Sequence, residues 1–286
     1  MKYWLLALSI LLFIPNVFNR HLVGLGGKPG RPEDFNPQLA NRIKSLAKLE
    51  NYIDSVIELR SKTTQVNTEL NVDVINSTVR MRFFHGYSHY SLRENWLAAL
   101  SGKLIWYDLS AIVIADDILQ YPMAACSQQA IVLMELFKRK KIPFRKIAFD
   151  HHFAVEAYIN KQWIYLDPNL EPEFQGTHRS FKYLKEGNRL KEIYKNILPS
   201  AEIPNLLGNP RYGRLNEYPA PKARILHHML STLSHFLWMF PLFLFGVNLW
   251  HRKKRSELST LPAEQPFIFQ EYKTWDENRE IGKQSH

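Results

Sequence analysis

The sequence predicts an α+β protein, in which a helix packs on an antiparallel sheet, placed between two transmembrane helices. Two long apolar segments, one at the start of the chain and one near residue 240, predict the membrane helices. Between them, a helical pattern of apolar residues begins at Cys126, and extended aromatic and β-branched runs follow from Phe144 to Asp167. A helix followed by a strand and a hairpin is typical of an α+β fold.

The composition indicates a folded, basic protein. The chain has 286 residues, a formal charge of +10 and 45% hydrophobic residues, so wholesale disorder is excluded. A positive charge of this size makes nucleic acid a partner to consider. However, the basic residues flank the two apolar segments, and Arg252–Arg255 directly follows the second. This placement is typical of membrane-flanking charge, so we expect a lipid bilayer, and no nucleic acid, as a partner.

The first apolar segment, Tyr3–Phe18, follows Lys2 and fits either a short membrane helix or the apolar core of a signal peptide. No A-x-A-like cleavage site follows it, because the chain continues with Asn19-Arg20-His21. We therefore favour an uncleaved signal anchor over residues 1–20, with a cleaved signal peptide as the alternative.

The second apolar segment, Met229–Trp250, contains no formally charged residue and predicts a transmembrane helix within residues 226–250. Pro241 and Gly246 are tolerated in membrane helices. A buried core helix is the alternative. The polar stretch 251–286 is expected to be a flexible tail.

The orientation in the membrane follows from the basic residues. Lys2 and Arg252–Arg255 favour two cytoplasmic termini, which would export the domain between the two spans. Arg20 and the basic residues at 211–224 weaken this bias, but long loops are translocated largely regardless of charge. We expect a two-pass membrane protein with a periplasmic or extracytoplasmic domain.

Before Cys126, the sequence is less regular. The Gly- and Pro-rich stretch 21–37 is expected to be a linker. Apolar residues then recur every three or four positions over Gln38–Arg60, which predicts a helix at the start of the main domain, residues 38–222. Val72–Phe84 is expected to be partly extended, and Ser91–Leu100 helical.

Cys126 is the only cysteine, so it can form no internal disulfide and is compatible with either compartment. Apolar residues on one helical face follow it, and basic residues at 138–141 precede Pro143, where we expect the helix to end. A helix N-terminus offers unpaired N–H groups and partial positive charge, which stabilise a thiolate. Cys126 is therefore either a small buried hydrophobic residue or a nucleophile.

The downstream hairpin selects a base for this nucleophile. Side chains alternate along a strand, so the neighbours His151 and His152 point to opposite faces. If Asn160-Lys161 is a two-residue turn, Asp167 faces Ala154 and becomes a diagonal neighbour of His152 on the same face. His151 would then be excluded. A one-residue change in loop length would reverse this parity.

These residues resemble a known family. A cysteine that opens a helix, the run KKIPFRK, the pattern H-x-x-x-E at His152–Glu156 and the pattern W-x-x-x-D at Trp163–Asp167 resemble the transglutaminase-like cysteine enzyme superfamily. The resemblance covers Gln120–Pro172. It implies a papain-like fold and a catalytic triad in which Cys126 is the nucleophile, His152 the base and Asp167 the orienting group.

Two residues depart from the family pattern, and one further role is suggested by spacing. Ala154 stands where an aromatic residue usually follows the histidine, and Ala125 replaces the usual glycine before the cysteine. Gln120, six residues before Cys126, resembles in spacing the oxyanion glutamine of papain-like enzymes. The backbone N–H of Cys126 is the other natural oxyanion donor.

The expected activity is cofactor-independent cleavage or transfer at an amide or ester bond, through a thioester on Cys126 that water or an amine resolves. The substrate class is a peptide, an isopeptide or another acyl compound. The alternative is a catalytically inactive member of the same fold that serves as a binding or assembly factor at the cell envelope. His85 and His89 are spaced like a helical metal pair, but no third ligand is evident, so we expect no metal.

Overall fold

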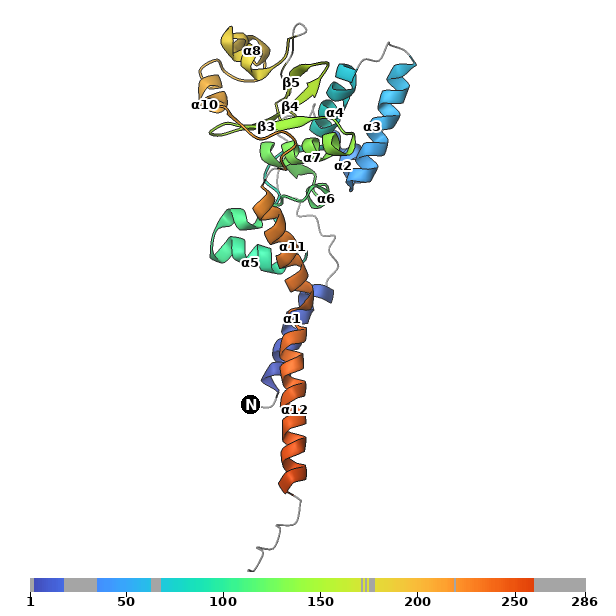
Figure 1. Cartoon of the computed structure of the whole chain (residues 1–286), viewed down its shortest axis with the longest axis vertical. Helices are drawn as coiled ribbons and strands as arrows, with labels where there is room; N and C mark the ends of the chain where they lie inside the picture. Colours follow the sequence, from blue (N-terminus) through green and yellow to red (C-terminus); the bar gives the residue numbers. More distant parts are fainter. Residues whose placement is uncertain are drawn as a thin grey trace, which may run out of the picture.

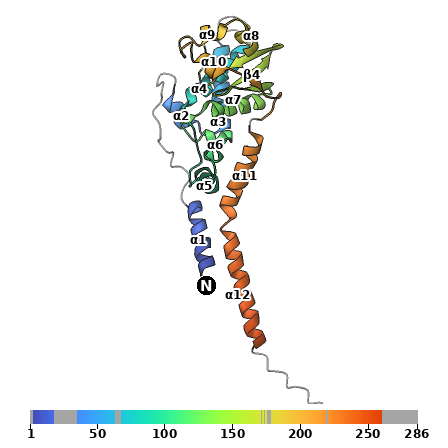
Figure 2. The same cartoon turned by 90° about the vertical axis from the view of Figure 1, so that its left-hand side faces the viewer.

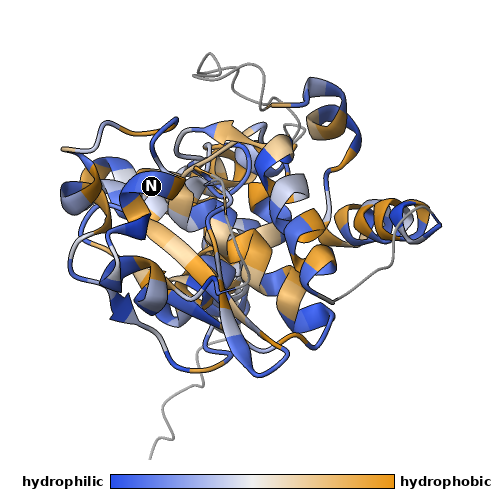
Figure 3. Cartoon of the chain, turned by 90° about the horizontal axis from the view of Figure 1, so that it is seen from above, coloured by the Kyte–Doolittle hydropathy of each residue, from blue (hydrophilic) through white to orange (hydrophobic). Residues whose placement is uncertain are grey.

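The computed structural model describes residues 3–17, 35–62, 68–170, 172, 174, 178–218 and 220–259. The molecule has a compact head of helices and strands, from which α1 (Trp4–Val17) and α12 (Met239–Ser259) extend together as a stalk (Figures 1 and 2). The predicted α+β class with an antiparallel sheet is confirmed. Apolar residues gather toward the middle of the head when it is viewed along the long axis (Figure 3).

The main sheet has the strand order β5-β4-β3-β6, and all its described pairs are antiparallel. Its strands are β3 (Phe144–Ala148), β4 (Phe153–Ile159), β5 (Gln162–Leu166) and β6 (Arg211–Tyr212). Asn160 and Lys161 form the β4–β5 turn with φ values of 50° and 66°, as a two-residue hairpin turn requires. Ile159 pairs with Gln162 and Glu156 with Tyr165, so the predicted register is confirmed.

The central helix α7 (Cys126–Arg139) packs against one face of this sheet and begins at the predicted residue. Helices α3 (Leu46–Ser61) and α4 (Thr68–Arg82) also contact α7. Side chains such as Leu133 and Phe137, both fully buried, join these elements into one hydrophobic core. Burial of this face is what stabilises α7 in its place.

Two predicted elements before α7 differ from the structure. The expected helix over Gln38–Arg60 is two helices, α2 (Pro37–Arg42) and α3, because Ser45 ends the extended connection and caps α3 by accepting from the N–H of Lys48 at 3.3 Å. Most of the expected linker at 21–37 lies outside the described residues.

The prediction of an extended segment over Val72–Phe84 is wrong for most of its length, since this region forms α4. Its β-branched residues favour strands locally. However, Val72, Ile75 and Val79 have helical spacing and are fully buried, so burial outweighs local preference. Only Phe84 continues into a short strand.

The remaining short elements lie around this core. They are β1 (Phe84–His85) paired in parallel with β2 (Met123–Ala124), α5 (Trp96–Leu104), the 3-10 helix η2 (Tyr107–Ser110), α6 (Ala115–Ile118), α8 (Phe181–Glu186), α9 (Arg189–Ile193) and α10 (Ile203–Leu207). A second hydrophobic cluster joins α8–α10 to Ile147, Ala154 and Tyr165 of the sheet. The predicted helix at Ser91–Leu100 starts only at Trp96, because Asn95 caps it by accepting from the N–H of Ala98.

The apolar C-terminal segment is not the single helix that the sequence predicts. It is divided at Leu237–Trp238 into α11 (Pro221–Phe236) and α12, which are bent by 41°. Within the described part of the chain, no single helix is long and apolar enough to cross a bilayer, although α11 and α12 together pass this test as a bent pair. With the shorter apolar α1, they are a weak indication of membrane association. The expected tail at 251–286 is helical as far as Ser259, and its remainder lies outside the described residues.

Candidate active site

The N-terminus of α7 is fixed in place by one buried glutamine. Gln128 Oε1 accepts hydrogen bonds from the backbone N–H groups of Ala125 at 3.1 Å and Ser88 at 2.9 Å. Its Nε2 donates to the carbonyl oxygens of Ser88 at 2.8 Å and Ile112 at 2.9 Å. The side chain therefore holds two neighbouring segments and the start of α7 together, with Cys126 as the first helical residue and 7% exposed.

The structure brings the three predicted residues of the triad together. His152 directly precedes β4 and Asp167 directly follows β5, so the hairpin register places them side by side. His152 Nε2 lies 2.8 Å from Asp167 Oδ2, and the side chains of both residues are buried. Cys126 and His152 line the same cavity, and the interaction with Cys126 contributes to the raised pKa of His152. Since Nε2 is taken by Asp167, Nδ1 is the ring nitrogen left for the thiol.

The carboxylate of Asp167 is held by a full set of donors. Its Oδ1 accepts from the backbone N–H groups of Asn169 at 3.2 Å and Leu170 at 3.1 Å. Its Oδ2 accepts from the hydroxyl of Tyr194 at 2.8 Å as well as from His152. The hydroxyl of Tyr165 lies 2.8 Å from that of Tyr194 and completes the network. These contacts fix one orientation of the carboxylate and favour its ionised form.

The electrostatics of the pair favour an imidazolium beside a carboxylate. Burial by itself lowers the pKa of His152, but the charge of Asp167 and the hydrogen bonds to Asp167 and Cys126 raise this pKa to about 10. Burial raises the pKa of Asp167, yet the charge of His152 and the donated hydrogen bonds bring it below its ordinary value. At neutral pH, the pair is therefore charged.

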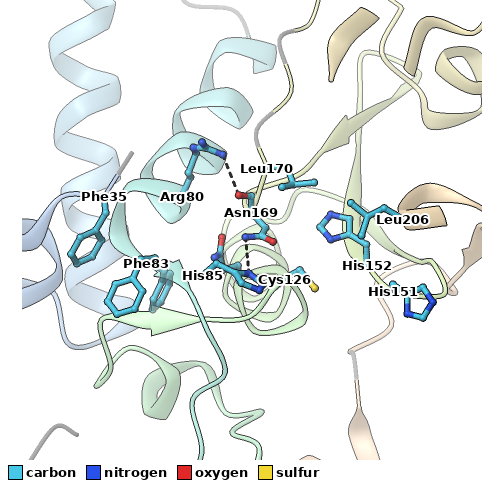
Figure 4. A pocket seen from close by; sticks show the side chains of 12 residues that line it. Phe35, Arg80, Phe83, His85, Cys126, His151, His152, Asn169, Leu170 and Leu206 are labelled. Carbon is cyan, nitrogen blue, oxygen red and sulfur yellow. Dashed lines mark hydrogen bonds between the residues drawn. The ribbon is translucent and has the colours of Figure 1, made fainter. Parts of the chain in front are cut away.

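A cavity of about 420 Å³ opens beside Cys126 (Figure 4). It is lined by Phe35, Arg80, Phe83, Phe84, His85, Cys126, Gln129, His151, His152, Asn169, Leu170 and Leu206. Phe35 and Phe84 meet edge to face at 5.2 Å and make one side of it aromatic. On the polar side, Asn169 Nδ2 donates to His85 Nδ1 at 3.1 Å, and burial lowers the pKa of His85. His151 is exposed at the cavity and is not hydrogen-bonded to Asp167.

Gln120, the predicted oxyanion donor, is not brought to Cys126. Its Nε2 donates to the carbonyl oxygens of Lys44 at 2.7 Å and Asp116 at 3.1 Å, and Gln120 does not line the cavity. The physical reason is α6, a short helix at Ala115–Ile118 that turns this stretch toward α2 and α3. Gln120 therefore joins these elements instead of facing the nucleophile.

Tyr87 is a neighbour of the nucleophile that the sequence did not indicate. The side chain of Tyr87 is 53% exposed, and its phenol interacts with Cys126 and with Ser127, the residue after it. Burial and the charge of Cys126 raise the pKa of Tyr87, and the hydrogen bond to Ser127 partly opposes this rise. A neutral phenol thus lies at the helix start. No sequence signal pointed to it, because the β1–β2 pairing that brings it there is only two residues long.

The spaced pair His85 and His89 does not form a metal site with a third ligand. His85 bonds Asn169, and His89 Nδ1 lies 2.9 Å from Ser110 Oγ. Among the residues that the structure describes, no group of three or more His, Cys, Asp or Glu side chains is placed to hold a metal ion.

The geometry defines a class of site: a buried cysteine–histidine–aspartate arrangement at the start of a helix in an α+β protein. Comparison with known proteins gave no match: no family model, no curated protein and no solved structure is significantly similar to this chain.

Proposed function

We propose that this protein is a membrane-anchored, transglutaminase-like cysteine hydrolase or acyltransferase. The observation that carries the proposal is the position of Cys126 at the first turn of α7, in one cavity with a histidine that is itself held by a buried aspartate at 2.8 Å. A nucleophile, a base and an orienting group in this order are the parts that acyl transfer requires. A buried packing cysteine needs none of them.

The chemistry follows from the three side chains. In the resting site, His152 Nδ1 already holds the proton that Cys126 gives up, and the thiolate attacks the carbonyl carbon of an amide or ester. The tetrahedral intermediate collapses when His152 returns the proton to the leaving amine or alcohol, which leaves a thioester on Cys126. Water or an amine then gives a proton to His152 and attacks the thioester, and the thiol is regenerated. Asp167 keeps Nδ1 directed at the sulfur throughout.

Two donors near the sulfur suit the developing oxyanion. As the first helical residue, Cys126 has a backbone N–H with no acceptor inside the helix. The hydroxyl of Tyr87 is the second, since it lies beside Ser127 and interacts with Cys126. Replacing Tyr87 by Phe should lower the acylation rate about tenfold or more, because an oxyanion donor is lost, while the melting temperature stays unchanged. An unaltered rate would exclude the hydroxyl from this role.

The cavity supports an acyl substrate with an apolar portion. Its aromatic side, formed by Phe35, Phe83 and Phe84, would take apolar groups, whereas His85 and Asn169 offer hydrogen bonds to a peptide or ester backbone. A peptide, an isopeptide or another acyl compound fits this combination.

The membrane part of the proposal is a two-pass chain with an exported head. Helix α1 contributes a span of roughly 21 Å at 1.5 Å per residue, and the α11–α12 pair contributes the other. Ser9 Oγ of α1 donates to the carbonyl of Trp238 at 2.7 Å, and the rings of Phe13 and Trp238 are 5.0 Å apart. The basic run Arg252–Arg255 supports a cytoplasmic C-terminus.

The direct test is turnover of an activated ester by the purified full chain. We expect p-nitrophenyl acetate to give a burst of nitrophenol followed by steady release, and the variants Cys126→Ala and His152→Gln to remain at the background rate. Cys126→Ser, which keeps the side-chain volume, controls for packing. A native rate equal to that of folded Cys126→Ala would contradict the proposal and favour the inactive binding or assembly factor.

A further inference from the structure

We propose that the tip between α5 and η2, residues Leu104–Tyr107, inserts into the headgroup layer of the bilayer and docks the head on the membrane surface. The tip residues Leu104, Ile105, Trp106 and Tyr107 are 79%, 77%, 61% and 65% exposed. Single exposed apolar residues are common, but four consecutive large ones form a patch that marks an interaction surface.

The tip is presented by a firmly held support. At the start of α5, Trp96 Nε1 donates to the carbonyl of Ser234 at 3.2 Å, and Asn95 Nδ2 donates to the carbonyl of His227 at 3.3 Å. At η2, the Nε2 of His227 lies 2.9 Å from the carbonyl oxygen of Leu109. Both ends of the α5–η2 unit are thus bonded to α11, so the exposure of the tip is a feature of the fold and not of a loose loop.

The support lies at the end of the head from which the stalk leaves. Figures 1 and 2 show α5 beside α11, at the end of the head nearest to α1. The carbonyl of Ser234 that accepts from Trp96 also accepts from Asn16 Nδ2 of α1 at 3.3 Å. The C-terminal ends of α1 and α11 and the start of α5 therefore meet at one level. A bilayer that covers α1 and α12 would have its surface close to this level.

The chemistry of the tip selects a lipid surface over a protein partner. Trp and Tyr prefer the membrane–water interface, where an apolar ring and a polar group are both satisfied. Lys103 and Arg93, both exposed, can reach anionic headgroups beside the apolar residues. Exposed apolar side chains also occur on α11, on the face turned away from its bonds to α5; they are Ile225, Met229 and Leu233.

This docking rests on the proposed membrane association but not on the chemistry of Cys126. The docking would fix the orientation of the head. Because the stalk is one attachment and the tip is another, the head is held at a fixed tilt above the bilayer. The cavity beside Cys126 then faces substrates at a constant height.

The test uses the fact that Cys126 is the only cysteine. In the full chain with Cys126→Ala, Trp106→Cys carries an NBD fluorophore, and Tyr183→Cys on α8, at the opposite end of the head, is the matched control. Both are placed in vesicles of phosphatidylcholine and phosphatidylglycerol, with or without lipids that carry a nitroxide quencher near the headgroup. We expect a blue-shifted emission and at least twofold quenching at residue 106, with no quenching at residue 183.

Two results would overturn the proposal. One is equal exposure to water at both positions. The other is shielding at residue 106 without lipid quenching but with self-quenching that grows with the protein-to-lipid ratio, which would indicate a second copy of the chain on the tip. As a further check, Ile105→Asp should abolish the quenching at residue 106 without changing the melting temperature, because the side chain is exposed. Since all these variants lack the thiol, the outcome is independent of the catalytic proposal.

Discussion

At the residue scale, the decisive feature is that both carboxylate oxygens of Asp167 accept hydrogen bonds. Every donor around this carboxylate, from Tyr194 to the N–H groups of Asn169 and Leu170, stabilises its ionised form. An ionised Asp167 in turn fixes the ring orientation of His152 through Nε2, which leaves Nδ1 for the thiol. The hydrogen bonds to Asp167 thus orient the base, His152, and the base in turn serves the nucleophile, Cys126.

Asp167→Asn should therefore lower the activity strongly, although the two side chains are nearly equal in size. The amide keeps the shape but removes the charge that raises the pKa of His152, so we expect a loss of about 10²- to 10⁴-fold in kcat on the activated ester. Tyr194→Phe, which removes one donor and leaves the charge, should cost only about tenfold. Equal effects of the two substitutions on kcat would contradict the role given to the charge.

The charged pair also makes stability depend on pH. The folded pKa of His152, about 10, is above its ordinary value of 6.5, so its contribution to the free energy of unfolding is full below pH 6.5 and is lost as pH rises through about 10. The folded pKa of Asp167 is below 3.8, so its contribution is present above pH 3.8 and is lost as pH falls through the folded pKa.

Melting temperatures of the native chain and of His152→Gln, measured from pH 6 to pH 10.5, check this sign. The difference between the two should be largest near pH 6 and should shrink steadily toward pH 10. A difference that stays constant over this range would show that His152 is not charged in the folded protein.

Part of the site is predictable at this scale and part is not. His152 and Asp167 could be paired from the sequence because a two-residue turn fixes hairpin parity over a short distance. Tyr194 reaches Asp167 from a separate helical region, and Tyr87 reaches Cys126 through a two-residue parallel pairing. Neither contact follows from local spacing. Gln120 is the opposite case. Its spacing from Cys126 suggested an oxyanion donor, but α6 directs this residue away from the nucleophile.

At the scale of elements, two buried polar side chains hold helices and loops in place. Gln128 satisfies four backbone groups around the start of α7. Arg82 at the end of α4 donates to the carbonyl oxygens of Ile43 and Tyr121 at 2.9 and 3.0 Å, and also to that of Leu119. Burial lowers the pKa of Arg82 to about 9. Both side chains thus hydrogen-bond backbone groups in the irregular connections around the core.

Gln128→Leu should destabilise the fold and the site together. The substitution leaves two buried N–H groups and two buried carbonyl groups without this partner, so we expect a loss of about 2–4 kcal/mol in the free energy of unfolding. Urea denaturation measures it, with Gln38→Leu on the exposed face of α2 as the matched control. A loss in Gln128→Leu no larger than in the control would contradict the structural role.

Element boundaries show where sequence reasoning succeeds and where it stops. The start of α7 and the turn of the β4–β5 hairpin were predictable, because a helical apolar face and Asn-Lys between strand-like runs are local signals. The helix at Thr68–Arg82 was not, because β-branched residues masked its period and burial against α2, α3, α7 and β4 stabilises it.

At the scale of the whole molecule, a stalk of apolar helices carries the head. The division of the C-terminal apolar segment at Leu237–Trp238 was not predictable, because hydropathy averages over a window and ignores a local bend. The bend changes how the stalk is built: α11 belongs partly to the head, through its bonds to α5, and α12 pairs with α1.

The proposed topology predicts opposite labelling of two positions in intact cells. In the Cys126→Ala chain, a membrane-impermeant maleimide should label Tyr183→Cys on the exported head, whereas Arg252→Cys beyond the stalk should react only after the cells are broken. The reverse pattern would place the head in the cytoplasm. Labelling of both positions in intact cells would show that α12 does not end on the cytoplasmic side.

The catalytic triad can be tested by the intact mass of the full chain during reaction with a slowly hydrolysed ester, followed by peptide mapping. We expect one acyl group on Cys126, formed rapidly in the native chain, at least 10²-fold more slowly in Asp167→Asn and not at all in Cys126→Ala. A folded native chain that acquires no acyl group on Cys126, or acquires it as slowly as Asp167→Asn, would contradict the assignment of a catalytic triad.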